Sequence, residues 1–322
     1  MTEEYDLAGN LFTRHNARVL LNGKYILFIG DSVQRGAYKD LVALLDDGSL
    51  LTDQEKKAKL EASFRGDHLL ARTEAHNNTN FTEIREWVGP SEDVEWSGSI
   101  MIRFVFTTRV WNDFVKTSFD ILSEDWFPDI ICANSTFWDI SRYGDKSYDS
   151  DKLQRFPQFE ANISTFMKEI NARAKVAVRR NKLTMPSLRI WRNALPIGRN
   201  ARGGLLIEEV QFGTDSEVYR MDLSQANLNI KERVDEAKWD LLDGQYYFRK
   251  LQAQPGMREK DGVHWHQIAH RWLTNIFLTH ICLAWEVKPP ELEKHDHTRP
   301  GGVPVMKTID GIRRMFEQYT HR

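Results

Sequence analysis

Apolar segments of strand length recur along the chain, and most of them are continuously apolar rather than alternating. They span residues 24–30, 100–106, 129–134, 188–195 and 239–248. Continuous apolar runs are typical of parallel strands that are covered on both faces. We therefore predict five strands of a mostly parallel sheet, of which the last is the least regular.

Helical patterns fill intervals between these segments. Residues 32–47 place apolar side chains along one stripe, at Val33, Tyr38, Leu41, Leu44 and Leu45. Residues 155–175 repeat apolar side chains at spacings of three and four, at Phe159, Ile163, Phe166 and Ile170. Pro157 is expected to interrupt the start of this second helix. Strands that alternate with helices predict a doubly wound α/β fold.

The last part of the chain has a different character. Residues 287–305 carry Pro and Gly pairs, many charges and few apolar residues, which is typical of an extended arm. Residues 308–319 could form a short helix that packs on the domain or on a partner. We predict one domain over residues 1–288 and an extended tail over 289–322, through which a protein partner could bind.

Charge and composition restrict the classes of partner. Lys and Arg number 44 against 46 Asp and Glu, so there is no positive excess that would favour nucleic acid or an anionic membrane as the main partner. No window approaches the roughly 18 apolar residues of a membrane span, and the first residues lack the pattern of a secretory signal. The two cysteines, Cys132 and Cys282, lie in apolar runs and are expected to be free thiols. We therefore expect an intracellular, cytoplasmic protein.

Gly30-Asp31-Ser32 stands where the first predicted strand ends and a helix begins. Asp and Ser are both good N-cap residues, so helix capping is one explanation. A serine nucleophile in the positive field of a helix N-terminus is the other. The tripeptide alone does not decide between them.

A nucleophilic serine needs a base, and the segment from 259 to 285 offers one. There Asp261-Gly-Val-His264 precedes a strongly apolar helical pattern. Asp261 could accept the Nδ1–H of His264 and fix its tautomer, which leaves Nε2 free to take the proton of Ser32. Ligands of open α/β sheets gather at the carboxyl ends of the strands, so Ser32 and His264 are expected to meet there.

Metal binding is an alternative for the same segment. Asp261, His264, His266 and His270 have spacings that a metal ion could use. A metal site would leave Gly30-Asp31-Ser32 unexplained, and no second cluster of ligands is evident. We therefore predict no metal and no cofactor.

Four separated motifs together resemble the PC-esterase family of the GDSL/SGNH hydrolase superfamily, and within it the PC-esterase domain-containing protein 1 group. They are GDSVQRGAYKDLV from residue 30, FVFTTRVW from 104, NSTFWDISRYG from 134 and DGVHWHQIAHRWL from 261. The resemblance covers roughly residues 11–288. It implies a three-layer α/β/α fold with a mostly parallel sheet, and a catalytic triad of Ser32, His264 and Asp261.

The resemblance also implies an oxyanion hole. Its donors are expected to be the backbone N–H of Ser32 and the side chain of Asn134, while Thr136 stands where the superfamily usually has an asparagine. Asn134 could instead be a turn residue that bonds its own backbone. No convincing equivalent of the superfamily's second-block glycine is evident.

Other residues near the motifs are candidates for binding the substrate. Arg35, one helical turn after Ser32, could hold an anionic or carbonyl group of the substrate, or pair with an acid. Trp265, Trp138 and Tyr143 could line a pocket, although aromatic side chains at such places often belong to the core.

Two classes of function follow from these residues. The first is a serine esterase that removes an acyl or acetyl group from a small molecule, glycan, lipid or modified polymer, with acetyl transfer to a hydroxyl as a variant. The second is a non-catalytic binding module that keeps the hydrolase fold. All three residue types of a triad are present, which favours the enzyme because a binder has no chemical need for that set.

Overall fold

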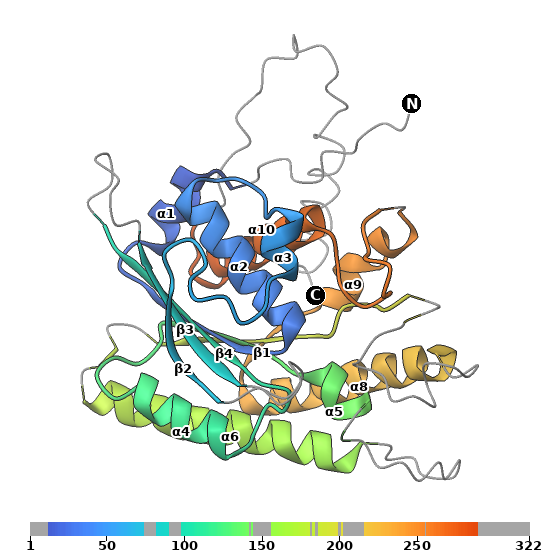
Figure 1. Ribbon diagram of the computed structural model, residues 1–322. Coiled ribbons are helices and arrows are strands. Elements are labelled where there is room, and N and C mark those ends of the chain that lie inside the picture. Colours follow the sequence, from blue (N-terminus) through green and yellow to red (C-terminus); the bar gives the residue numbers. More distant parts are fainter. Residues whose placement is uncertain are drawn as a thin grey trace.

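A mixed seven-stranded sheet, in the order β2-β3-β4-β1-β5-β6-β7, forms the centre of the computed structural model (Figure 1). Its parallel strands are β1 (Tyr25–Gly30), β4 (Ile100–Phe106), β5 (Ile130–Asn134), β6 (Leu188–Arg192) and β7 (Asp240–Leu242). Beyond β4, β3 (Glu83–Gly89) runs antiparallel to β4, and β2 (His68–Arg72) runs antiparallel to β3. The sheet is therefore parallel at its centre and antiparallel at one edge.

The structure describes most of the predicted domain. The described residues are 12–73, 82–89, 98–141, 143, 156–180, 182–183, 186–198, 201, 216–254 and 256–288. The predicted tail, 289–322, lies outside them.

Helices cover both faces of the sheet (Figure 1). One layer contains α1 (Arg14–Leu21), α2 (Ser32–Asp46) and α10 (Gln267–Ala284), and the opposite layer contains α4 (Asp113–Leu122), α6 (Pro157–Arg179) and α8 (Ser216–Ala237). Shorter elements are α3 (Asp53–Lys57), α5 (Thr136–Ser141), α9 (Gly244–Phe248) and the 3-10 turn η1 (Leu251–Ala253). The predicted three-layer α/β/α fold with a mostly parallel sheet is confirmed.

Local differences from the predicted elements have physical explanations. The predicted strand 239–248 ends at Leu242, because the side chain of Asp243 accepts the N–H of Tyr246 and caps α9. Pro157 does not interrupt α6 but is its first residue, where the missing N–H of proline costs no helical bond. Among the described helices, none is long and apolar enough to cross a membrane.

Close packing of α2 against α10 positions the carboxyl edge of the sheet. A Cβ atom at Gly36 would lie 2.2 Å from Cε1 of the buried His270, so only glycine leaves room for this ring. One turn further along α2, the buried Asp40 accepts bonds from Arg271 Nε (3.0 Å) and Thr274 Oγ1 (2.6 Å). These contacts fix the start of α2 beside the loop that precedes α10.

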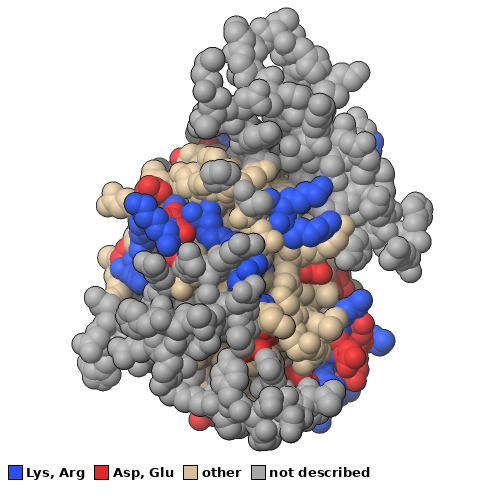
Figure 2. Space-filling model, turned by 90° about the vertical axis from the view of Figure 1, so that its right-hand side faces the viewer, with Lys and Arg blue, Asp and Glu red and all other residues tan. Residues whose placement is uncertain are grey.

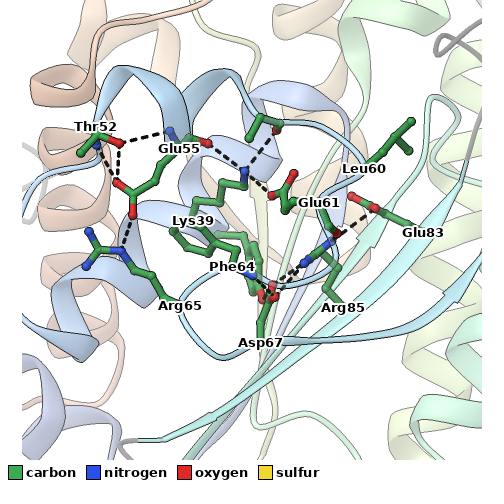
Figure 3. A network of polar contacts seen from close by, with 12 residues as sticks. Lys39, Thr52, Glu55, Leu60, Glu61, Phe64, Arg65, Asp67, Glu83 and Arg85 are labelled. Carbon is green, nitrogen blue, oxygen red and sulfur yellow. Dashed lines mark hydrogen bonds and ion pairs between the residues drawn. The ribbon is translucent and has the colours of Figure 1, made fainter.

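A buried ion pair anchors the antiparallel edge of the sheet (Figure 3). Arg85 of β3 donates to both carboxylate oxygens of Asp67 at 2.7 Å, and neither side chain is exposed. The same carboxylate accepts the hydroxyl of Tyr38 from α2 (2.8 Å) and the N–H of Phe64 (2.5 Å). One carboxylate therefore joins β3, α2 and the segment before β2.

Lys39 of α2 extends this network toward α3 (Figure 3). Its ammonium group pairs with Glu61 at 2.5 Å and donates to the carbonyl oxygens of Glu55 (2.8 Å) and Ala58 (3.2 Å). The segment that links α2 to β2 has little regular structure, so these polar contacts hold it in place of helix or strand bonds.

Replacing Asp67 with Asn should destabilise the fold strongly, because the buried charge of Arg85 loses both 2.7 Å bonds to a carboxylate and is left with the longer 3.6 Å ion pair to Glu83. We expect the free energy of unfolding, measured by urea denaturation, to fall by about 3 kcal/mol. Asp125→Asn, at an exposed position, is the matched control and should change it by less than about 0.5 kcal/mol. Equal effects of the two substitutions would contradict the anchoring role of Asp67.

Candidate active site

Ser32 is the first residue of α2 and directly follows β1, at the carboxyl edge of the sheet. Helix capping is performed by Asp31, whose Oδ1 accepts the N–H groups of Val33 (2.9 Å) and Gln34 (3.4 Å). Gly30 is required before them, because its φ is +157° and an added Cβ would lie 2.1 Å from the Asn134 carbonyl oxygen. The cap and the serine thus have separate tasks, and the hydroxyl of Ser32 is free for another contact.

That contact is with His264. The Oγ atom of Ser32 lies 2.7 Å from Nε2 of His264, and Nδ1 of the same ring lies 2.6 Å from Oδ2 of Asp261. With the Nδ1–H tautomer, His264 donates to Asp261 and accepts the hydroxyl proton of Ser32. The structure therefore brings together the three residues that the sequence proposed as a triad.

Asp261 also shapes the loop that carries the imidazole. Its Oδ1 accepts the N–H groups of Val263 (2.8 Å) and His264 (2.9 Å). Partial burial disfavours the charged carboxylate. This effect is outweighed by the bond with the His264 ring, the charge of that ring and the two backbone N–H donors, which together lower the pKa of Asp261 to about 2. Asp261 is thus an ionised orienting group at any ordinary pH.

The two other histidines of the segment have different surroundings. His266 is the N-cap of α10 and accepts the N–H of Ile268 at 3.5 Å. Burial lowers the pKa of His270 to about 3, so its ring is neutral where it packs against Gly36. No group of three or more His, Cys, Asp or Glu side chains within the described residues is arranged to hold a metal ion.

Asn134 does not present its side chain as the predicted oxyanion donor. The residue is fully buried at the end of β5, and its Nδ2 donates to the carbonyl oxygen of Arg192 in β6 at 2.6 Å. This bond ties two strands together below the site. Thr136, the first residue of α5, is also fully buried, and its Oγ1 has no hydrogen-bond partner. The geometry therefore gives the oxyanion role predicted for Asn134 no support.

The backbone N–H of Ser32 is a better donor in this structure. The side chain of Asp31 accepts the N–H groups of Val33 and Gln34, and no acceptor among the described residues occupies the N–H of Ser32. A free N–H at the first position of a helix carries part of the positive end of the helix dipole. The oxyanion role of this N–H stays a prediction, and no described residue occupies the group.

Arg35 lies on the same face of α2 as Ser32, because residues three apart are neighbours on a helix. It is 5% exposed, stacks over Phe106 at 5.4 Å, and makes no hydrogen bond or ion pair with the described residues. Burial lowers the pKa of Arg35, and the nearby acids oppose this only in part. The predicted contact of Arg35 with a substrate oxygen stays a prediction, since the guanidinium is buried over Phe106.

The aromatic candidates divide between core and surface. Trp265 is fully buried. The centre of its ring lies 4.8 Å from the centre of the Phe248 ring, and the guanidinium of Arg258 lies 4.4 Å from the centre of the Trp265 ring. The predicted substrate contact of Trp265 is therefore replaced by a role in packing. Tyr143 is partly exposed, and its hydroxyl bonds Thr108 Oγ1 at 2.8 Å.

Asp139 is a titratable residue near the site that the sequence did not single out. It accepts the hydroxyl of Ser135 at 2.8 Å and lies 3.8 Å from Arg109, yet burial dominates and raises its pKa to about 7. Its place in the motif NSTFWD, shortly after a strand that ends at the site, was the available signal. The charge of Asp139 therefore changes near neutral pH.

A buried polar layer beneath Ser32 was also missed. Gln34 donates to the carbonyl oxygen of Cys132 (2.8 Å) and accepts a bond from Arg192 Nε (2.9 Å). Burial raises the pKa of Asp31, and the charge of Arg192 opposes this effect. The apolar pattern of β5 and β6 conceals this layer, because its polar members come from strand ends and the first turn of α2.

A sheet that is parallel at its centre, with helices on both faces, makes this an α/β protein with three α/β/α layers. No protein-family model matches the chain. The chain is nevertheless homologous over most of its length to the PC-esterase domain-containing proteins 1A and 1B. The predicted resemblance is thereby confirmed.

Three curated relatives define this homology. PC-esterase domain-containing protein 1A of Mus musculus is 35% identical over 289 residues, which are 88% of this chain and 57% of the relative. The Homo sapiens 1A protein is 34% identical over 87% of this chain and 56% of the relative, and the Homo sapiens 1B protein is 30% identical over 94% and 63%. The chain thus spans between half and two thirds of the length of these relatives.

Solved structures with a similar arrangement include two bacterial or metagenomic enzymes. Axe2, an acetylxylan esterase from Geobacillus stearothermophilus, aligns with a TM-score of 0.42 and 15% identity over 84% of this chain and 99% of its own. LAE5, an alpha/beta hydrolase enzyme from the metagenome of Lake Arreo, aligns with a TM-score of 0.40 and 13% identity over 85% and 98%.

The charge state of Asp139 should be visible in the pH dependence of stability. Its raised pKa means that the folded protein keeps the proton up to about pH 7, whereas the unfolded chain loses it near the ordinary aspartate pKa of 3.8. Stability should therefore decline as pH rises through this interval. Asp139→Asn removes this decline. The difference in free energy of unfolding between the variant and the wild type should therefore shift by about 2 kcal/mol in favour of the variant from pH 4 to pH 8.

Urea denaturation at a series of pH values measures this difference. Asp125→Asn, which changes an exposed carboxylate, should follow the wild-type pH dependence. A difference between Asp139→Asn and wild type that is the same at pH 4 and pH 8 would show that Asp139 does not titrate in this range.

Proposed function

We propose that this protein is a serine esterase that hydrolyses an acyl or acetyl ester. The observation that carries the proposal is the unbroken series of short contacts from Ser32 Oγ to His264 Nε2 (2.7 Å) and from His264 Nδ1 to Asp261 Oδ2 (2.6 Å). The names of the homologous PC-esterase proteins support the same class of reaction.

Acylation follows from this geometry. Ser32 Oγ attacks the carbonyl carbon of the ester while its proton passes to Nε2 of His264, and Asp261 stabilises the imidazolium that forms. The tetrahedral intermediate then collapses, the carbon–oxygen bond to the alcohol breaks, and the leaving oxygen takes the proton from Nε2. The products of this step are the free alcohol and an acyl ester on Ser32.

Deacylation repeats the steps with a second nucleophile. Water gives its proton to Nε2 of His264 and attacks the acyl carbon, so that the acid is released and Ser32 recovers its proton. A hydroxyl group of another molecule in place of water would give acyl transfer by the same chemistry. Both reactions use the same three residues, so the nature of the acceptor separates them.

Charge on the carbonyl oxygen develops beside α2. The N–H of Ser32 stands at the N-terminus of α2 with no acceptor among the described residues. The guanidinium of Arg35, which has no ion pair among them, comes from the same face of α2 as Ser32. We assign these two groups as the donors that stabilise the oxyanion, and one such donor typically contributes about 3 kcal/mol to the transition state.

Ser32→Ala should abolish ester hydrolysis and leave the fold intact, since only one hydroxyl at a helix start is removed. We expect the kcat for p-nitrophenyl acetate to fall by at least about 10³-fold and labelling by a fluorophosphonate probe to disappear. Ser123→Ala is the control, because that hydroxyl donates to the Phe119 carbonyl at the far end of α4. Equal turnover by wild type and Ser32→Ala would favour the non-catalytic binding module.

Asp261→Asn tests the orienting role of the carboxylate. An amide can donate to Nδ1 and leave Nε2 protonated, so kcat should fall by about 10⁴-fold with a smaller change in KM. Asp261, with a pKa of about 2, should add no step to the pH–rate profile of the wild type above pH 4.

A pH–rate series from pH 4 to pH 9 measures both effects. Asp235→Asn, at an exposed position on α8, is the matched control and should keep the wild-type profile. If Asp261→Asn kept the wild-type rate, or if a chelator removed the activity, the proposed triad would be wrong.

A further inference from the structure

An open groove of about 560 Å³ lies between α8, α9 and the segment that follows β6. Both charged side chains among the described residues that line it are arginines. Its charged and polar lining consists of Arg220, Ser224, Gln225, Gln245, Arg249 and Gln252. The groove therefore offers cationic and amide hydrogen-bond donors to a ligand.

The groove adjoins the loop that carries Asp261 and His264. Its wall includes Pro196 and Ile197, and the next residue, Gly198, donates its N–H to the carbonyl oxygen of Gly262 at 2.7 Å. A Cβ at Gly198 would lie 3.2 Å from the Cα of Gly262, so the two segments are in direct contact. A molecule in the groove would thus lie against the segment that supports the catalytic loop.

Positive charge accumulates between the groove and this loop. Arg258 donates to the Gly262 carbonyl oxygen at 3.1 Å, and its buried Nη2 has no hydrogen-bond partner among the described residues. Burial and the nearby charge of Arg220 together lower the pKa of Arg258 to about 10, against the opposing effect of Asp261. Two arginines that repel each other, with no ion pair to an acid among the described residues, leave an excess of positive charge here.

The second arginine of the groove is held in a defined orientation. Arg249 donates to the carbonyl oxygen of Tyr246 at 2.7 Å, and its guanidinium lies 3.3 Å from the centre of the Tyr246 ring. Lys and Arg side chains form several separate patches on the face where α5, α8 and α9 lie (Figure 2). A preorganised guanidinium loses little freedom when it binds a planar anion.

We propose that this groove binds a carboxylate or phosphate group carried by the ester substrate, with Arg220 and Arg249 as its ligands. Guanidinium groups form paired, charge-assisted hydrogen bonds with both anions. Positive charge in a concave surface also raises the local concentration of an anion. The glutamine and serine side chains of the groove can bond hydroxyl groups of the same molecule. This inference rests on the proposed esterase function, since it names the class of ester that the site selects.

Three acetate esters of related phenols test the proposal. They are 4-acetoxybenzoate, 4-acetoxyphenyl phosphate and the neutral methyl 4-acetoxybenzoate. In the double variant Arg220→Gln/Arg249→Gln, we expect KM for at least one of the two anionic esters to rise by about tenfold or more, with kcat changed less than about twofold. KM for the methyl ester should stay within about twofold of wild type. The anionic ester that loses more affinity identifies carboxylate or phosphate as the preferred group.

Lys231→Gln is the matched control, because Lys231 is an exposed cation on α8 outside the groove. It should leave all three KM values unchanged, which separates binding in the groove from the general attraction of positive charge. Equal KM changes for the neutral and anionic esters, or no change for either anion, would overturn the proposal.

Binding to a variant without the nucleophile separates this inference from the esterase proposal. Titration calorimetry of Ser32→Ala with 4-hydroxybenzoate and phenyl phosphate should detect binding that Arg220→Gln/Arg249→Gln removes and that weakens with salt. Such binding without turnover of any ester by wild type would retain the anion site and reject the esterase. Turnover of the methyl ester, with no binding of either anion to Ser32→Ala, would retain the esterase and reject the anion site.

Discussion

The close contact between α2 and α10 is the constraint on which the site depends. Ser32 begins one of these helices, and His264 lies just before the other, 232 positions later in the chain. The absence of a side chain at Gly36 allows the ring of His270 to fill the contact, and Asp40 holds Arg271 one turn further on. Because the helices cannot slide without breaking these buried contacts, the 2.7 Å approach of serine and imidazole is set by packing.

Three carboxyl groups near this contact show how environment separates chemical roles. Asp261 is partly open to solvent and receives a ring N–H and two backbone N–H groups, so its pKa is lowered to about 2. Asp31 and Asp139 are buried, and their pKa values are raised because fewer donors compensate the lost hydration. Asp31 therefore serves the backbone of α2 as a cap, whereas Asp261 contacts the imidazole of His264 directly, at 2.6 Å from Nδ1.

The sequence predicted the centre of the fold and the meeting of three site residues, because continuous apolar strands and the spacing of Asp261 and His264 are local patterns. It missed β2 and β3, whose charged residues take part in ion pairs that only the tertiary structure reveals, as Arg85 does with Asp67. It also assigned Asn134 by resemblance, although the register of β5 beside β6 decides where that amide donates. Such cross-strand partners cannot be read from one segment.

The burial of Asn134 changes how the proposed reaction would stabilise its charged intermediate. With this amide bonded to Arg192, two groups in the described first turn of α2 remain as proposed donors, the N–H of Ser32 and the guanidinium of Arg35. Both belong to the first turn of α2, so the nucleophile and its proposed oxyanion donors would move as one rigid unit. The α10 side would then supply only the base and its carboxylate. Catalysis would accordingly depend on the relative position of two helices, which the contact between Gly36 and His270 determines.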